Sequence, residues 1–164
     1  MRHDQAETWV HGAIAGLLAY AAIVVLYAVG NLLVGRSPLT TASELGTALF
    51  PYLANPDGAI SITAVIAYNG VHMVGSVALG MAGAWLLHEV DLYPAIWYPV
   101  FFLATTAAIF ATVYIALLVT ELLGAASWTS IVVANVVAML LAAAYLWHTH
   151  PGLEDRIARF ADGE

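Results

Sequence analysis

Four long apolar stretches, separated by polar segments, dominate the pattern of the chain. Each is close to the roughly 20 residues that a helix needs to cross about 30 Å of hydrocarbon. They cover about Trp9–Val34, Ala59–Leu87, Ala95–Leu123 and Ser127–Trp147. The first is much longer than the apolar core of a signal peptide, so we expect it to stay in the protein as a span. The pattern predicts an all-α fold, an integral membrane four-helix bundle that forms a single transmembrane domain over residues 1–164.

The connections between the spans differ in length. His88–Asp91 joins the second span to the third, and Gly124–Ala126 joins the third to the fourth. Because such short loops connect antiparallel helices, we expect these spans to be packed neighbours. Residues 35–58 form a much longer connection between the first two spans.

Two short amphipathic helices are expected outside the spans. In the long connection, Thr41–Glu44 fits a capping box, and apolar side chains follow at helical spacing until Pro51 interrupts them. These side chains are Leu45, Ala48, Leu49 and Tyr52. They favour a helix that lies flat on the membrane surface. The tail after Pro151 places Leu153, Ile157 and Phe160 on one face, which is typical of an amphipathic C-terminal helix.

Four spans place both termini on one face of the membrane, which we call side A; the opposite face is side B. Side A holds Arg2, Arg156 and Arg159, and side B holds Arg36. Because cytoplasmic segments carry the excess of positive charge, we expect both termini in the cytoplasm. The predicted location is the inner, cytoplasmic membrane of the cell.

Composition makes the lipid bilayer the solvent of most of the chain. Hydrophobic residues make up 62% of it and charged residues 9%, against about 45–50% and 25% in soluble domains. The net charge of −7 comes from 11 acidic residues against four arginines, with no lysine, so there is no basic patch for nucleic acid. The absence of cysteine excludes disulfides and thiolate metal sites.

Small and polar residues form a seam along the second span. Asn69, His72, Ser76, Gly80 and Gly83 recur at intervals of three and four and therefore share one helix face. The first span carries Gly12-x-x-x-Gly16, followed by Tyr20, Tyr27 and Asn31, and the fourth carries Asn135. Such seams mark the faces on which helices pack in lipid.

His72 is the ionisable side chain nearest the middle of the membrane. At 1.5 Å per residue it lies roughly 18 Å from the side B end of its span and about 24 Å from the other end. It could fix the helix register through hydrogen bonds to Tyr20, Thr112 or Asn135, which lie at similar depth. It could instead contact a haem or a quinone, with Tyr68 and Asn69 beside it, or relay protons.

The other histidines favour a different kind of site. His11, His88, His148 and His150 fall at the side A ends of the spans, with His3 on the tail nearby. Together they could bind Zn²⁺, Cu²⁺ or a haem near the membrane surface, or they could serve as interfacial anchors. No second histidine lies at the depth of His72, which argues against a bis-histidine haem b in the bundle core.

Catalytic motifs are absent from the sequence. It contains no G-x-S-x-G, no H-E-x-x-H, no glycine-rich phosphate loop and no pair of carboxylates within a span. We therefore expect no enzyme. No aspartate or glutamate lies at mid-membrane depth, which disfavours an ion-coupled transporter.

Short motifs point to one family. Residues 35–40 read GRSPLT, residues 45–50 read LGTALF, Tyr68 precedes His72 by four residues, and residues 146–151 read LWHTHP. In these motifs the chain resembles an uncharacterised family of small four-span bacterial integral membrane proteins. It departs from the family pattern at Thr41-Ala42, where that pattern has Thr-Pro. The resemblance implies a four-span protein and no activity.

Three functions follow from these observations as hypotheses. The first is a non-enzymatic accessory subunit or helper of a larger membrane complex, of the energy-transducing kind, with other membrane protein subunits as partners. The second is a redox protein that binds haem or a metal through His72 or through the side A histidines. The third is a small channel or transporter along Asn69, His72 and Ser76.

Overall fold

The computed structural model describes residues 2–123 and 128–161, and within these ranges the chain is helical without strands. Over these residues the chain forms four long helices, two short helices and two 3₁₀ turns. Their bounds are α1 Arg2–Leu33, α2 Thr40–Leu49, η1 Pro51–Leu53, α3 Ile62–Leu92, η2 Pro94–Ile96, α4 Trp97–Leu123, α5 Trp128–His148 and α6 Leu153–Ala161. The predicted all-α bundle is confirmed.

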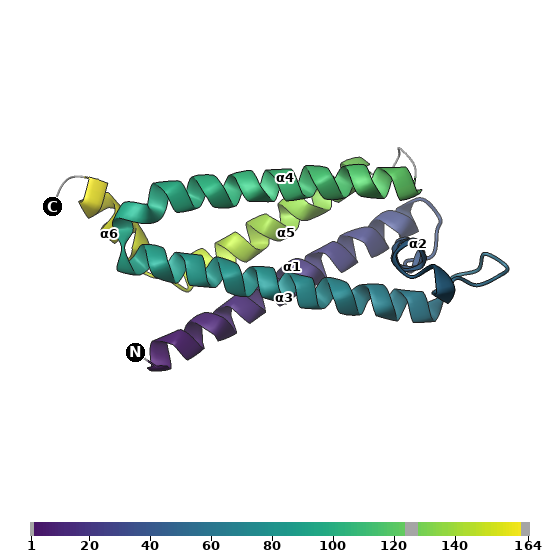
Figure 1. The fold of residues 1–164 in the computed structure, drawn as a ribbon, viewed down its shortest axis with the longest axis horizontal. Coiled ribbons are helices and arrows are strands. Elements are labelled where there is room, and N and C mark those ends of the chain that lie inside the picture. The colour runs from purple at the N-terminus through teal and green to yellow at the C-terminus, as the bar shows by residue number, and fades with distance from the viewer. Residues whose placement is uncertain (1, 124–127, 162–164) are drawn as a thin grey trace.

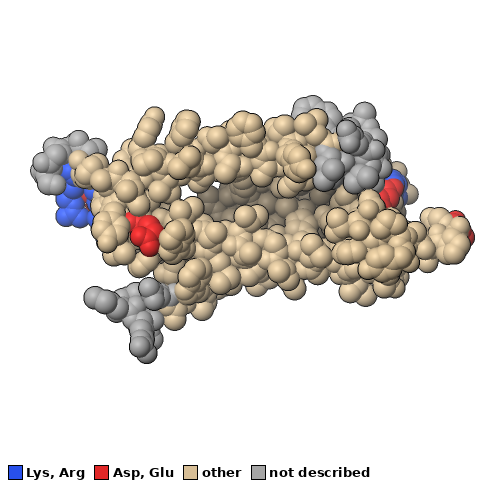
Figure 2. Space-filling view, in the orientation of Figure 1, with Lys and Arg blue, Asp and Glu red and all other residues tan. Residues whose placement is uncertain are grey.

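Four segments are long and apolar enough to cross a membrane, so the chain is a multi-pass membrane protein. They are Ala6–Leu33, Ile62–Leu92, Pro94–Ile115 and Thr129–His148. Both ends of the chain lie at the same end of the bundle (Figure 1), as four spans require. On the face seen in Figure 2, the coloured charged residues lie toward the two ends, and the middle of the described surface shows none.

Helix α1 is the centre of the bundle, because both α3 and α5 pack against it. Its contact with α3 depends on glycine at Gly12, Gly16 and Gly80. A Cβ atom added at Gly12 would lie 2.6 Å from the Cα of Met81, and one added at Gly80 would lie 2.7 Å from the Cα of Gly16. The two backbones therefore approach each other as closely as small residues allow, which is the usual packing device in lipid.

Small apolar clusters join α1 to its two neighbours. One cluster contains Ala15, Ala84 and Leu146, and the other contains Ile23, Ala134 and Ala138. Alanine dominates both, so the helices meet through their small faces and direct most large side chains outward to lipid.

Helix α2 confirms the predicted short helix, but the predicted capping box is wrong. The N-cap residue is Leu39, and among the described residues no side chain caps the helix. The hydroxyl of Thr41 instead pairs with the side chain of Asn31 on α1. Because this partner lies ten residues away, the local capping pattern in the sequence could not reveal it.

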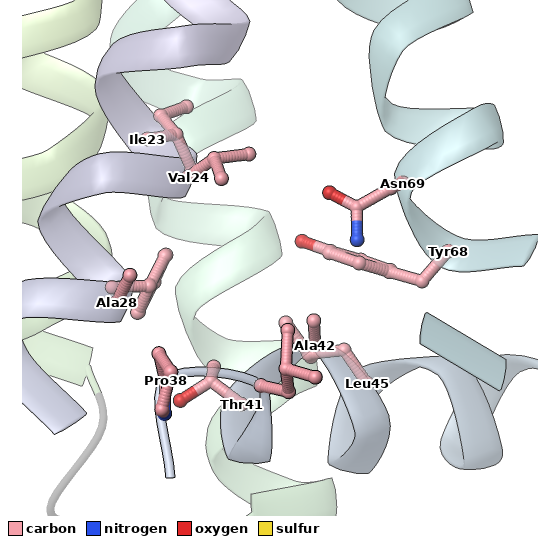
Figure 3. A pocket seen from close by; sticks show the side chains of 11 residues that line it. Ile23, Val24, Ala28, Pro38, Thr41, Ala42, Leu45, Tyr68 and Asn69 are labelled. Carbon is pink, nitrogen blue, oxygen red and sulfur yellow. The ribbon is translucent and has the colours of Figure 1, made fainter. Parts of the chain in front are cut away.

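The face of α2 that meets the bundle consists of small residues. Ser43 and Gly46 are buried against α3, whereas Leu49 and Tyr52 are exposed. Ser43 accepts a hydrogen bond from the backbone N–H of Ser61 at 2.9 Å. Helix α2 therefore turns its small face to the bundle and lies across the side B ends of α1 and α3 (Figures 1 and 3).

The connection between α3 and α4 corrects a second expectation. His88–Asp91 is not a loop, because α3 continues to Leu92 and the turn follows at Tyr93 and η2. Helices α3 and α4 run antiparallel but touch at few residues, so the short turn does not make them packed neighbours. Helix α4 contacts α5 instead. The expected turn at Gly124–Ala126 lies outside the described residues.

The C-terminal amphipathic helix is confirmed as α6. Gly152 adopts a φ of +92°, which favours glycine, and allows the chain to turn back after α5. Leu153 is fully buried, and α6 packs against η2 at the start of α4. Arg156 pairs with Asp91 of α3 at 3.0 Å, and the indole N–H of Trp147 donates to Glu154 at 2.9 Å.

Candidate functional site

The structure brings Tyr68, Asn69 and His72 of α3 together with Tyr20 of α1. The hydroxyl of Tyr20 donates to Oδ1 of Asn69 at 3.0 Å, which joins the two helices. The hydroxyl of Tyr68 and Nδ1 of His72 share a hydrogen bond of 3.1 Å within α3. The imidazole also meets both tyrosine rings edge to face, at centroid distances of 5.7 and 5.5 Å.

This cluster is largely satisfied by its own members. Nδ2 of Asn69 donates to the carbonyl of Val65 at 2.8 Å, so both ends of the amide are used. Among the described residues, no buried side-chain nitrogen or oxygen lacks a hydrogen-bond partner. A satisfied polar cluster between two helices fixes their register.

The partners of His72 differ in part from those that depth along the spans suggests. The ring of Tyr20 contacts the imidazole, but its hydroxyl donates to Asn69. Asn135 donates to the carbonyl of Ile131 in its own helix at 2.8 Å. Among the described residues, none of the three predicted partners, Tyr20, Thr112 and Asn135, forms a hydrogen bond with His72, whose Nδ1 bonds to Tyr68 one turn away on the same helix face.

A cavity of about 90 Å³ lies between this cluster and side B, bordered by α1, α2 and α3. Figure 3 shows the Tyr68 hydroxyl and the Asn69 amide directed into it from α3, opposite Val24 of α1. The residues that line it are Ile23, Val24, Tyr27, Ala28, Pro38, Leu39, Thr41, Ala42, Leu45, Tyr68 and Asn69. Thr41 and Leu45 of α2 form the outer wall.

A larger groove of about 490 Å³ opens beside this cavity, between α1, α2 and α5. It shares Tyr27 and Thr41 with the smaller cavity. Its lining includes Asn31 and the ion pair between Arg36 and Glu44. The two spaces are therefore neighbours on either side of Tyr27 and Thr41.

The side A histidines do not form a common site in the described structure. Nδ1 of His11 shares a hydrogen bond of 2.9 Å with the hydroxyl of Tyr145, and Nδ1 of His150 donates to the carbonyl of Leu146 at 2.8 Å. His88 lies in the last turns of α3 and His148 ends α5. Within the described ranges, no three histidine, aspartate or glutamate side chains gather as metal ligands.

Sequence reasoning missed the polar contacts between α1 and α2. Asn31 is almost fully buried and its Nδ2 lies 2.9 Å from Oγ1 of Thr41. A buried asparagine at the end of a span signals a polar partner, but the sequence could not identify it because the partner lies across a turn. Tyr27, which separates the two cavities, carries no signal beyond its place in the α1 seam.

The polar groups at mid-depth join α1 to α3 and are paired with one another. Hydroxyl, amide and imidazole groups are paired, and in the described part of the chain no carboxylate or arginine forms an ion pair with His72. Comparison of the chain with protein-family models, with curated proteins and with solved structures finds no match.

Proposed function

We propose that the protein is a non-enzymatic accessory subunit or helper of a larger membrane complex, of the energy-transducing kind, and that α4 is the helix by which it joins that complex. The observation that carries this proposal is the low burial of α4. In its most apolar 18-residue stretch, 0% of the residues are buried within the described structure, against 11% for α3 and 22% for α1 and for α5.

The exposed surface of α4 is rich in large aromatic side chains. Tyr98, Phe101, Phe102, Phe110 and Tyr114 are each at least 60% exposed. Aromatic residues are enriched at the centres of protein interfaces, where they supply most of the binding energy. In lipid, helices associate through such van der Waals packing because contact with acyl chains is already apolar. The helices of another membrane protein therefore offer α4 the packing that its own bundle does not.

The rest of the described structure supports a binding role over catalysis. The polar groups between α1 and α3 are paired with each other, which suits a rigid scaffold. Helix α6 covers η2 at the start of α4 and so holds this end of the helix against the bundle. A scaffold that fixes one end of an exposed helix presents the remainder of it to a partner.

We place the protein in the inner, cytoplasmic membrane with both termini in the cytoplasm. Arg156 and Arg159 of α6 lie at the end of the bundle that holds both termini, and Arg36 lies near the opposite end, beside α2. The excess of positive charge therefore favours side A as the cytoplasmic face.

Site-specific photo-crosslinking from α4 tests this proposal. A photoreactive phenylalanine analogue replaces Phe110, which is 71% exposed, and in a matched control replaces Leu79 of α3, which is 75% exposed. The tagged protein is purified from its own membranes in mild detergent, and mass spectrometry identifies what is attached. We expect a stoichiometric membrane protein on Phe110 and none on Leu79. Equal labelling at both positions, or elution as a bare monomer or homodimer, contradicts the proposal.

The same purified sample tests the redox hypothesis. A haem bound through His72 gives a Soret band that is lost in His72→Ala. A metal bound by the side A histidines is found by elemental analysis and is lost in a variant without His11, His88 and His148. A colourless, metal-free sample, prepared with haem supplied, excludes that hypothesis and leaves the subunit proposal untouched.

A further inference from the structure

Polar groups lie at several points along the side B half of the bundle, from its surface toward His72. The outermost are the Arg36–Glu44 pair, followed by Asn31 and Thr41, which line the larger groove. Tyr27 and Thr41 then border the smaller cavity. Tyr68 and Asn69 form its inner wall, and Tyr68 bonds to His72.

The smaller cavity is large enough to hold water and has polar groups on part of its wall. A site needs roughly 10–15 Å³ of such volume for each water, together with two to four polar partners. The cavity measures about 90 Å³, and four of its eleven lining residues are polar: Tyr27, Thr41, Tyr68 and Asn69. Figure 3 shows the Asn69 amide and the Tyr68 hydroxyl directed into it. Water molecules there have the hydrogen-bond partners that a purely apolar cavity lacks.

The side A half of the α1–α3 contact is closed. One turn beyond His72, the backbone of Ser76 and Val77 meets Gly16; a Cβ atom added at Gly16 would lie 2.6 Å from the Cα of Val77. Gly80 and Gly12 continue this contact toward the termini. A helix pair packed backbone to backbone leaves no room for water, whose radius is about 1.4 Å.

We infer that the side B half of the bundle contains a water-filled, dead-end path that ends at Tyr68, the hydrogen-bond partner of His72, so that the imidazole exchanges protons with side B through Tyr68 and not with side A. The ligand of this site is water, together with the proton that it carries. The titratable groups that face His72 are Tyr20 of α1 and Tyr68 of α3. Tyr27 lies farther out, on the cavity wall.

Cysteine accessibility tests this inference cleanly, because the natural chain has no cysteine. His72→Cys reports the inner end of the path and Ala28→Cys reports the cavity wall. Val74→Cys is the matched control on α3, since Val74 is 66% exposed on the lipid-facing surface. Asp57→Cys and Glu154→Cys identify sides B and A of sealed vesicles. Silver ion, which is small and does not cross lipid, is applied to one face, and the thiols left unreacted are labelled with a fluorescent maleimide after denaturation.

We expect His72→Cys and Ala28→Cys to react at least tenfold faster from the face that modifies Asp57→Cys than from the face that modifies Glu154→Cys. Val74→Cys should react from neither face. Equal rates for His72→Cys and Val74→Cys overturn the path, and equal rates from the two faces overturn its dead end. Ala28→Cys leaves every polar pair intact and decides the question if His72→Cys does not accumulate.

Filling the cavity provides the second test. Ala28→Leu, introduced into the His72→Cys protein, should slow the silver reaction from side B at least fivefold. Ala21→Leu is the matched control, because Ala21 lies on the exposed face of the same helix. If Ala28→Leu leaves the rate unchanged, water does not reach His72 through this cavity and the inference fails.

Discussion

Helices α3 and α4 are both long and apolar, yet they are built into the protein in opposite ways. Helix α3 meets α1 backbone to backbone at Gly80 and is tied to it by the bond between Tyr20 and Asn69. Helix α4 offers large aromatic side chains instead and contacts its own bundle sparsely. Hydrophobicity therefore brings both helices into the membrane, but only small and polar residues decide which helices pack inside the chain.

Filling the glycine contact should produce the largest loss. In Gly80→Leu the side chain meets the backbone of Gly16, which cannot move without separating the two helices. We expect a cost of about 3 kcal/mol, at the upper end of the usual range for overpacking. Gly75→Leu is the control, because among the described residues nothing lies within 4 Å of a Cβ atom at that position. Unfolding measured by denaturant titration in micelles should separate the two variants, and equal stability would show that the contact is unimportant.

Removing the interhelical hydrogen bond should have a moderate effect. A double-mutant cycle with Tyr20→Phe and Asn69→Ala isolates the bond between them, for which we expect a coupling of about 0.6–1.7 kcal/mol, as for other hydrogen bonds between membrane helices. Tyr114→Phe on α4 removes a hydroxyl from a side chain that is 68% exposed and should cost nothing measurable. A coupling near zero would assign the register of α1 and α3 to the glycines alone.

The ion pair between α6 and α3 should matter less. Arg156→Gln removes the contact with Asp91; the side chains of Arg156 and Asp91 are 44% and 22% exposed. Such pairs contribute about 0.2–1 kcal/mol, and added salt should reduce the difference from the natural protein. Arg159→Gln is the control, since the Arg159 side chain donates to the backbone of its own helix. A loss that is insensitive to salt would point to packing of the arginine stem.

Truncation on α4 should have the smallest effect on the isolated protein. Phe110→Ala removes a side chain that is 71% exposed, so we expect a change within about 0.5 kcal/mol, as for other exposed sites. The comparison is Leu146→Ala, at a side chain that is 5% exposed and should cost about 2–5 kcal/mol. Thermal unfolding in the same detergent checks both. A large loss in Phe110→Ala would show that α4 is packed within the chain after all.

The sequence predicts what depends on local pattern. Hydropathy locates the four spans, and the spacing of Leu153, Ile157 and Phe160 predicts α6. The seam of Asn69, His72 and Gly80 predicts which face of α3 packs. Each of these inferences uses residues within one helix, where periodicity fixes which side chains share a face.

What depends on contacts between distant segments could not be predicted. The local pattern predicts that the Thr41 hydroxyl caps α2, but this hydroxyl pairs with Asn31. The pattern also predicts a loop at His88–Asp91, but α3 continues through these residues because none of them ends the helix. For the site, the helical spacing places Tyr68, Asn69 and His72 together, whereas their hydrogen bond to α1 through Tyr20 depends on a contact between two helices. Depth along a span does not specify which helices are neighbours, so the sequence also predicts Asn135 beside His72, where the structure does not place a bond between them.

The central position of α1 has a consequence for synthesis. Helix α1 leaves the ribosome first, but the helices that cover it, α3 and α5, are made later. Until α5 enters the bilayer, the face of α1 around Ile23 lacks the alanines of α5 that finally bury it. The order in which the helices are inserted therefore differs from the order in which they can pack. A nascent chain halted before Trp128 exposes the face of α1 that α5 later covers, and chaperones and proteases can reach it.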